Sequence, residues 1–275
     1  MNKIDDNFSV LMSIYKKENP KYFDIAMQSI WDNQTLKPCE IVLVEDGELT
    51  LPLYEIIKKW KDKLNDILVS IPLKQNVGFA KALNIGLDYC SSELIMRMDT
   101  DDISMPNRFE IQYQYMQKNK SVSACGTYIE EFDQNNVEYK NILKLPVENE
   151  DLKEFVKLRS PICHPSSMFR KKDILEVGNY PELRLGQDYA LWSVLIARGY
   201  EISNIPKVLL KLRTNSDFFK RRGWDSFKYE VDVMKLQYNE NLINIFELVK
   251  AFSLRFILRL SPVFVKKIAY KILRK

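Results

Sequence analysis

Histidine is nearly absent from this sequence, in which His164 is the single example among 275 residues. The four cysteines stand far apart and form no C-x-x-C pair, so the usual zinc sites lack their ligands. Cysteines at such wide spacing favour reduced thiols in a cytosolic compartment. With 46% apolar and 28% charged residues, the composition is that of a folded globular protein and excludes collagen-like or wholly disordered chains.

Glycine is also scarce, and the eight glycines build neither of the common phosphate-binding loops. The sequence contains no G-x-G-x-x-G and no G-x-x-x-x-G-K-S/T, which argues against a Rossmann dehydrogenase and against a P-loop enzyme. If a diphosphate binds to this protein, we expect a metal ion to supply much of the compensating charge.

Long apolar runs are missing as well. No stretch approaches 18 uncharged apolar residues, so we predict no membrane-spanning helix. The first seven residues carry two acids and no apolar run, which argues against a signal peptide. We therefore expect a cytoplasmic protein.

Charge is nearly balanced overall but not along the chain. Residues 249–275 carry eight cations and no acid, which, taken from the net charge of +4, leaves −4 for residues 1–248. Apolar residues such as Phe252 and Phe256 are interleaved with these cations, so we predict a basic amphipathic helix that lies on an anionic membrane. The alternative is a helix that packs on the body or on a partner subunit. We predict no nucleic-acid partner.

Short apolar segments alternate with amphipathic segments through the first hundred residues. We predict strands at 8–15, 40–44, 67–73 and 93–98, and helices at 19–33, 53–64 and 77–90. This order predicts an α/β fold with a mostly parallel, Rossmann-like central sheet flanked by helices. Later in the chain we predict a helix at 106–116, a hairpin of 122–132 and 138–145, a strand at 166–169 and a helix at 188–198.

Carboxylates follow two of the predicted strands directly. They are Glu45, Asp46, Asp99, Asp101 and Asp102. Ligands of parallel sheets bind at these strand ends, and so many negative charges would repel one another unless a cation lay among them. Oxygen ligands with no histidine or cysteine nearby favour Mg²⁺ or Mn²⁺. The alternative is a solvated acidic turn that caps the following helix.

Other candidate residues have ordinary structural explanations. Asp188 precedes a helix and could simply be its N-cap. His164 lies in a loop bracketed by prolines, where a structural role is the default interpretation. Arg221 and Arg222 fit a solvated loop better than a phosphate clamp. We retain His164, Arg221 and Arg222 as a possible acceptor or diphosphate region.

In combination, eight motifs resemble the family-2 glycosyltransferases, which have the GT-A fold. In chain order the motifs are SVLMSIY at 9–15, IWDNQT at 30–35, EIVLVEDG at 40–47, NVGFAKALN at 76–84, MDTDD at 98–102, PNRF at 106–109, HPSSMFR at 164–170 and GQDY at 186–189. The resemblance covers residues 8–212 and is greatest to bacterial members that build O-antigen, capsule or exopolysaccharide. It implies a GT-A domain at 1–215, followed by a helical extension at 216–275 that is basic and amphipathic from about 249.

The resemblance also implies roles for residues at the matching positions. Ser13 and Tyr15 would line a nucleoside pocket, and Asp46 would bind the uracil. Asp101 would contact the ribose. Glu45 stands where the family usually has aspartate.

The resemblance also implies which residues bind the metal ion and which residue is the catalytic base. Asp102 and Asp99 would face Mn²⁺ or Mg²⁺ on the diphosphate, and Asp188 matches the catalytic base. Gln187 stands where glutamate is common. These roles imply an inverting transfer of a sugar from a nucleotide-sugar donor, such as a UDP-sugar, to a glycan acceptor carried on a lipid diphosphate. The enzyme would then work on the cytoplasmic face of the inner membrane.

Two other functions stay open at this point. A sugar-1-phosphate nucleotidyltransferase would need a glycine-rich basic loop after the first strand, and Lys16-Lys17-Glu18-Asn19 is not such a loop. The second alternative is a non-catalytic protein that binds a nucleotide-sugar. The presence of all the expected carboxylates argues against it.

Overall fold

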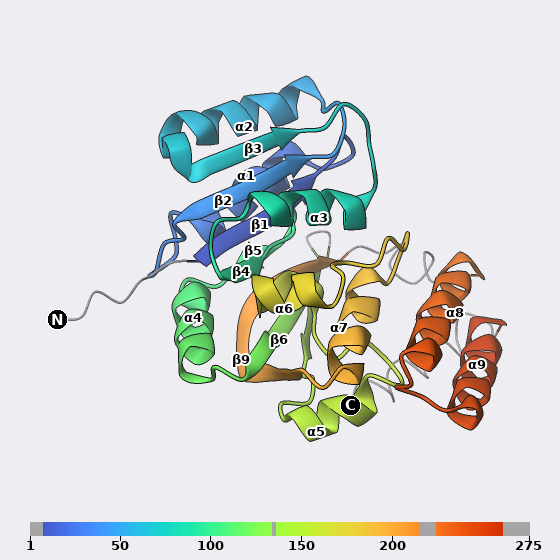
Figure 1. Cartoon of the computed structure of the whole chain (residues 1–275). Coiled ribbons are helices and arrows are strands. Elements are labelled where there is room, and N and C mark those ends of the chain that lie inside the picture. The colour runs from blue at the N-terminus through green and yellow to red at the C-terminus, as the bar shows by residue number, and fades with distance from the viewer. Residues whose placement is uncertain (1–7, 134–135, 215–223, 261–275) are drawn as a thin grey trace.

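A nine-stranded mixed sheet forms the centre of the computed structural model, which describes residues 8–133, 136–214 and 224–260 (Figure 1). The strands follow the order β3-β2-β1-β4-β8-β6-β9-β5, and β7 pairs with β6 outside this path. Because one sheet runs through both halves of the chain, the second half packs onto the first as one unit.

The four N-terminal strands are parallel. Their bounds are β1 (Phe8–Ile14), β2 (Glu40–Glu45), β3 (Leu68–Pro72) and β4 (Leu94–Arg97). They pair in the order β3-β2-β1-β4, and β1 and β2 are buried on both faces, which explains their continuous apolar runs. The predicted α/β order is confirmed in this half.

Helices cover both faces of these strands. Their bounds are α1 (Pro20–Ile30), α2 (Leu51–Leu64) with the short η1 (Asn65–Ile67), and α3 (Phe79–Tyr89). Helices α1 and α2 pack with Val10 and Met12 on one face of β1, whereas α3 packs with Leu11 on the other. Gly86 permits the close approach of α3, since a Cβ there would lie 2.5 Å from Leu11 Cδ1.

The rest of the sheet departs from the expected mostly parallel order. Its strands are β5 (Ile103–Ser104), β6 (Val122–Asp133), β7 (Asn136–Leu143), β8 (Met168–Arg170) and β9 (Glu201–Thr214). β8 runs antiparallel to β4 and β6, and β6 and β7 form the predicted antiparallel hairpin. β9 was not predicted, because Pro206 and several charged residues interrupt its apolar pattern. β9 nevertheless pairs in parallel with β6 along nearly its whole length.

The remaining helices lie around the second half of the sheet. They are α4 (Arg108–Lys118), α5 (Asn149–Phe155), η2 (His164–Ser166), α6 (Lys171–Glu176), α7 (Gln187–Ala197), α8 (Trp224–Asn239) and α9 (Ile245–Leu260). Nearly every residue of α7 is buried, and α8 and α9 lie beside it as a pair (Figure 1).

The predicted amphipathic helix is described in part. Helix α9 begins at Ile245, where the Asn244 side chain accepts hydrogen bonds from the amides of Phe246 and Glu247. Residues 261–275, the rest of the predicted basic tail, lie outside the described residues. Among the helices of the described ranges, none has the length and apolar character needed to cross a membrane.

Candidate active site

The C-terminal ends of three parallel strands lie next to one another. Ile14 at the end of β1 is the register partner of Glu45 at the end of β2, and the Asp46 amide donates to the Ile14 carbonyl at 2.7 Å. On the other side of β1, the Met98 amide that follows β4 donates to the Leu11 carbonyl at 3.3 Å. The carboxylates that follow β2 and β4 therefore flank the end of β1, as the parallel order predicted.

Asp46 is buried and organises the loop that precedes α3. Its Oδ1 accepts from the Val77 amide at 2.7 Å, and its Oδ2 accepts from the Asn76 side chain at 2.9 Å and from the Gly78 amide at 3.2 Å. Gly47 completes the turn, because its φ is +87° and a Cβ there would lie 2.6 Å from the Asn76 nitrogen. A carboxylate offers about four acceptor positions, so Asp46 retains capacity for a further donor.

Asp99, Asp101 and Asp102, here called the acidic cluster, follow β4 directly. One carboxylate oxygen from each lies within 4.8 Å of the others. Asp102 is 1% exposed, and its Oδ1 accepts from the Arg213 amide at 2.8 Å. Its Oδ2 is buried and has no hydrogen-bond partner among the described residues. A buried, unpartnered carboxylate oxygen beside two further carboxylates suits a divalent cation that prefers oxygen ligands.

Burial and mutual repulsion disfavour the charged form of the acidic cluster. Burial, followed by the charges of Asp99 and Asp101, raises the pKa of Asp102 well above its ordinary value. Burial and the charge of Asp99 raise the pKa of Asp101 to about 6. A bound cation would lower both pKa values, because it stabilises the carboxylate form.

Arg97, the last residue of β4, places a guanidinium group beside the acidic cluster. It is fully buried, forms an ion pair with Asp99 and donates to the Leu11 carbonyl at 3.1 Å. Its guanidinium carbon lies 5.1 Å from the centre of the Phe79 ring. Arg97 was not among the predicted site residues. A single cation in the apolar strand 93–98 was a usable signal, because a buried charge needs a partner.

Two more arginines act on the acidic cluster. Arg213, near the end of β9, donates from Nε to the Asp101 carbonyl at 2.8 Å, and its guanidinium carbon lies 3.9 Å from the centre of the Tyr22 ring. Arg108 is fully buried at the start of α4, and its positive charge opposes the rise in the pKa of Asp102. Arg108 lies in the PNRF motif but was given no role, and no sequence pattern marked Arg213, since each meets the cluster only through the tertiary fold.

Asp188, the second residue of α7, lies within electrostatic reach of the same cluster. It is half-buried, and burial is the largest cause that raises its pKa to about 6. The negative charge of Asp99 adds to this rise, and the positive charge of Arg97 opposes it. The structure therefore brings the predicted base and the predicted metal ligands into one site.

Glu18, in the loop between β1 and α1, is a further carboxyl group that the sequence analysis did not select. Burial and the negative charges of Asp101 and Asp99 raise its pKa to about 7, and a hydrogen bond from the Thr100 side chain opposes this rise. No spacing in Lys16-Lys17-Glu18-Asn19 marks this residue, because the cluster that it faces lies eighty residues away.

The formal charges in this region do not cancel. Five carboxyl groups and three guanidinium groups interact electrostatically in this region. The carboxyl groups are those of Glu18, Asp99, Asp101, Asp102 and Asp188, and the guanidinium groups are those of Arg97, Arg108 and Arg213. Five carboxylates against three guanidinium groups leave an excess of two negative charges. This excess applies when all five carboxyl groups are ionised, and a bound cation would favour that state.

The remaining predicted residues are placed as follows. Ser13 is half-buried near the end of β1, and Tyr15, just beyond the strand, is 40% exposed. Arg221 and Arg222 lie outside the described residues. Ser13 and Tyr15 thus lie at the end of β1, next to the end of β2 that Asp46 follows.

His164 lies in η2 within a buried group of aromatic side chains. Its Nε2 is 2.9 Å from the Tyr180 hydroxyl, and its ring meets the Phe79 ring edge-on with the centres 5.9 Å apart. Burial and the positive charge of Arg97 hold the pKa of His164 well below its ordinary value. The imidazole is therefore neutral near pH 7, and it packs against the Phe79 ring that Arg97 also contacts.

Residues 9–178 match the family model described as Glycosyl transferase family 2. This chain belongs to that family.

Two relatives extend the match along the chain. Amylovoran biosynthesis glycosyltransferase AmsE of Erwinia amylovora is 37% identical over 269 residues, which cover 98% of this chain and 99% of AmsE. UDP-Gal:alpha-D-GlcNAc-diphosphoundecaprenol beta-1,3-galactosyltransferase of Escherichia coli is 38% identical over 267 residues, which cover 96% of this chain and 95% of the relative.

A solved structure supports the fold of this family-2 glycosyltransferase. The S. aureus TarS 1-349 structure in complex with UDP-GlcNAc aligns with a TM-score of 0.68 at 19% identity, covering 91% of this chain and 72% of TarS 1-349. At that identity the likeness shows the fold alone, and it agrees with the predicted GT-A fold. The predictions of an enzyme and of a glycosyltransferase are confirmed by the family match.

Proposed function

We propose that this family-2 glycosyltransferase moves a sugar from a UDP-sugar to a glycan carried on a lipid diphosphate, with inversion at the anomeric carbon. The observation that carries the proposal is the acidic cluster at the end of β4, together with its electrostatic interaction with Asp188 at the start of α7. The Escherichia coli relative, whose name specifies GlcNAc-diphosphoundecaprenol, supports the acceptor class, and AmsE supports a place in surface-polysaccharide synthesis.

The donor would bind across the ends of β1, β2 and β4. Ser13 and Tyr15 would line the nucleoside pocket, and Asp46 would accept the imide N–H of the uracil. Asp101 would contact the ribose. The hydrogen bonds from Val77 and its neighbours support this role for Asp46, because they fix its carboxylate before the donor arrives.

Asp102 and Asp99 would hold Mn²⁺ or Mg²⁺ near the donor diphosphate. The buried Oδ2 of Asp102 and the excess of negative charge support this assignment. When bound, the ion supplies positive charge that stabilises the leaving nucleoside diphosphate. Arg97 would keep the carboxylate of Asp99 in place beside that ion.

Asp188 would act as the general base. The acceptor hydroxyl attacks the anomeric carbon from the face opposite the diphosphate, and its proton passes to the Asp188 carboxylate. The bond between the anomeric carbon and the diphosphate breaks in the same step, which inverts the centre. A pKa raised to about 6 leaves Asp188 mostly ionised at pH 7 and makes it a stronger base than an exposed aspartate.

For the acceptor we propose a binding region and no individual contacts. We place the acceptor or its diphosphate near His164 and near Arg221 and Arg222, of which the two arginines lie outside the described residues. His164 would act through Arg97 rather than by direct proton transfer, because its lowered pKa keeps it neutral.

A lipid-linked acceptor makes peripheral attachment to the cytoplasmic face of the inner membrane useful. In α9, Phe246 is 83% exposed and Ile257 is 62% exposed, and Lys250 lies between them in the sequence. Together with the cations of residues 261–275, this pattern supports binding to anionic lipid. We retain the division into a GT-A domain at 1–215 and an extension at 216–275 as part of this proposal.

A transfer assay tests the proposal directly. A panel of UDP-sugars would be incubated with a GlcNAc-diphosphate-lipid acceptor and Mn²⁺, and product and UDP would be measured. We expect stoichiometric UDP and glycosylated lipid. Release of pyrophosphate from a nucleoside triphosphate would instead indicate a nucleotidyltransferase, and donor binding without transfer would indicate a non-catalytic protein.

A further inference from the structure

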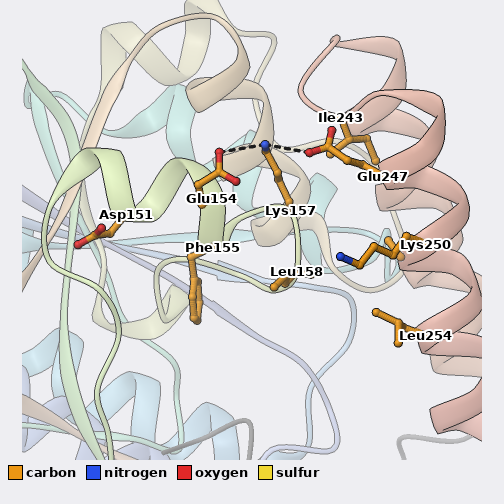
Figure 2. A pocket seen from close by; sticks show the side chains of 10 residues that line it. Asp151, Glu154, Phe155, Lys157, Leu158, Ile243, Glu247, Lys250 and Leu254 are labelled. Atoms are coloured by element: carbon orange, nitrogen blue, oxygen red, sulfur yellow. Dashed lines mark hydrogen bonds and ion pairs between the residues drawn. The ribbon is translucent and has the colours of Figure 1, made fainter.

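Helix α9 is attached to the segment that follows α5. Lys157 forms ion pairs with Glu154 at 3.0 Å and with Glu247 of α9 at 3.1 Å, beside a groove of about 420 Å³ between the two helices (Figure 2). Two turns further along α9, Arg255 Nη2 donates to the Leu158 carbonyl at 2.8 Å. The helix therefore contacts two consecutive residues of this segment.

The same guanidinium group contacts the helix that carries Asp188. Arg255 Nη2 donates to the Tyr189 hydroxyl at 3.1 Å, and that hydroxyl donates to the Val156 carbonyl at 2.6 Å. Tyr189 is buried and follows Asp188 directly in the first turn of α7. The Tyr189 hydroxyl thus donates its one hydrogen to Val156 and accepts a hydrogen bond from Arg255, which joins α9 to α7.

Helix α8 supports this turn from a second direction. Gln237 Nε2 donates to the Val156 carbonyl at 2.8 Å and to Ser193 Oγ at 2.9 Å. Ser193 Oγ in turn donates to the Tyr189 carbonyl at 2.8 Å. The C-terminal helix pair consequently constrains the first two turns of α7, through buried hydrogen bonds from α8 and a partly buried one from α9.

We propose that Arg255 and Tyr189 are positioning residues that hold Asp188 in the orientation required for transfer. The inference rests on the proposed function, in which Asp188 accepts the proton of the acceptor hydroxyl. Arg255 lies on the helix whose exposed residues include Phe246 and Ile257, so the element proposed to lie on the membrane also fixes the turn that carries the base. A small displacement of a base lowers kcat more than it weakens donor binding.

Substitutions of the two residues test this role in the full-length protein. Tyr189→Phe and Arg255→Met are each expected to lower kcat about tenfold, while the KM for the UDP-sugar stays within about twofold. Arg255→Lys should recover part of the loss because it keeps a donor at this position. The double variant should lose less than the product of the two single losses, since both substitutions remove the contact between Arg255 and Tyr189.

Arg198→Gln is the matched control, because Arg198 pairs with Glu240 at 2.9 Å at the other end of α7. We expect it to leave kcat unchanged. Wild-type kcat in Tyr189→Phe, independent losses that multiply in the double variant, or an equal loss in Arg198→Gln would overturn the inference. If Arg255→Met does not fold, Tyr189→Phe tests the positioning role by itself, because it keeps the buried ring and removes only the hydroxyl group. A wild-type protein that transfers no sugar would overturn both this inference and the proposed function.

Discussion

Arg97 and Asp99 form an ion pair at the end of β4. The pair ties the first carboxylate of the acidic cluster to the strand, and Arg97 also donates to the carbonyl of Leu11 on β1. Because Arg97 is fully buried, its charge must be balanced inside the protein. One side chain therefore links the central strands to the candidate metal site.

Removal of this buried charge should destabilise the protein. Arg97→Met leaves Asp99 without its partner, so we expect the free energy of unfolding to fall by about 3 kcal/mol. Arg97→Lys should cost less, since it keeps the charge but loses the planar guanidinium group. Urea denaturation in metal-free buffer measures both. A loss no greater than that of Lys58→Met, an exposed ion-pair residue on α2, would contradict the prediction.

Asp188→Asn should abolish most of the activity without preventing donor binding. The amide cannot accept the proton of the acceptor hydroxyl, so we expect kcat to fall about a thousandfold, with donor affinity within a few-fold of wild type. Steady-state kinetics and calorimetry with UDP measure the two quantities. Asp173→Asn, in the first turn of α6, is the matched control. Turnover near the wild-type rate would remove Asp188 from the mechanism.

Asp102→Asn should weaken donor binding only when metal is present. The substitution keeps the shape of the side chain but removes a charge and a metal-ligand oxygen, so the affinity for UDP with Mn²⁺ should fall about tenfold. The affinity measured in EDTA should not change. Asp151→Asn on α5 serves as a control for the loss of one carboxylate elsewhere. Equal donor affinities with and without Mn²⁺ in the wild type would argue against the metal site.

Stability of the metal-free protein should rise as the pH falls from about 7.5 to about 5.5. The pKa values of Asp101 and Asp188 are raised to about 6, above the value of about 3.9 in an unfolded chain. The folded state therefore binds more protons in this window, and its free energy of unfolding decreases as the pH increases. His164 acts in the opposite direction, because its pKa lies well below the ordinary value.

Comparison with a variant separates these contributions. Asp101→Asn keeps His164 and should show a weaker dependence of stability on pH than the wild type, and saturating Mn²⁺ should weaken the wild-type dependence as well. Urea titrations at the two pH values provide the measurement. An unchanged dependence in Asp101→Asn would show that other groups control it.

Substitutions on the exposed side of α9 should release the protein from anionic vesicles. Phe246→Glu and Ile257→Glu place a carboxylate among exposed apolar residues, and we expect co-flotation with phosphatidylglycerol vesicles to fall about fivefold. Leu51→Glu, at an equally exposed apolar position on α2, is the control and should float like the wild type. Point variants are preferable to truncation at Leu248, which would also remove Arg255. Equal flotation of all four proteins would contradict the membrane assignment.

Much of the fold was predictable where the signal was local. The first four strands are short segments rich in apolar residues, and β1, β2 and β4 are almost wholly buried, because both faces of a parallel sheet are covered. The acidic cluster was also predictable, because Asp99 and its neighbours follow the apolar segment of β4 directly in the sequence. β9 was missed because Pro206 and charged residues obscure its apolar pattern, and its pairing with β6 supplies the stabilisation instead.

Sequence alone determined the β-α order, the strand-end carboxylates and the family resemblance, because each depends on neighbouring residues and on motif order. Only the tertiary structure decided which distant charges meet those carboxylates. Arg213 reaches Asp102 across 111 positions of the chain, and Arg255 reaches Tyr189 across 66. Such contacts follow from how strands and helices pack in space, and no spacing along the chain encodes them. The physical reason is burial: a charge removed from water needs a partner, and folding brings that partner from elsewhere in the sequence.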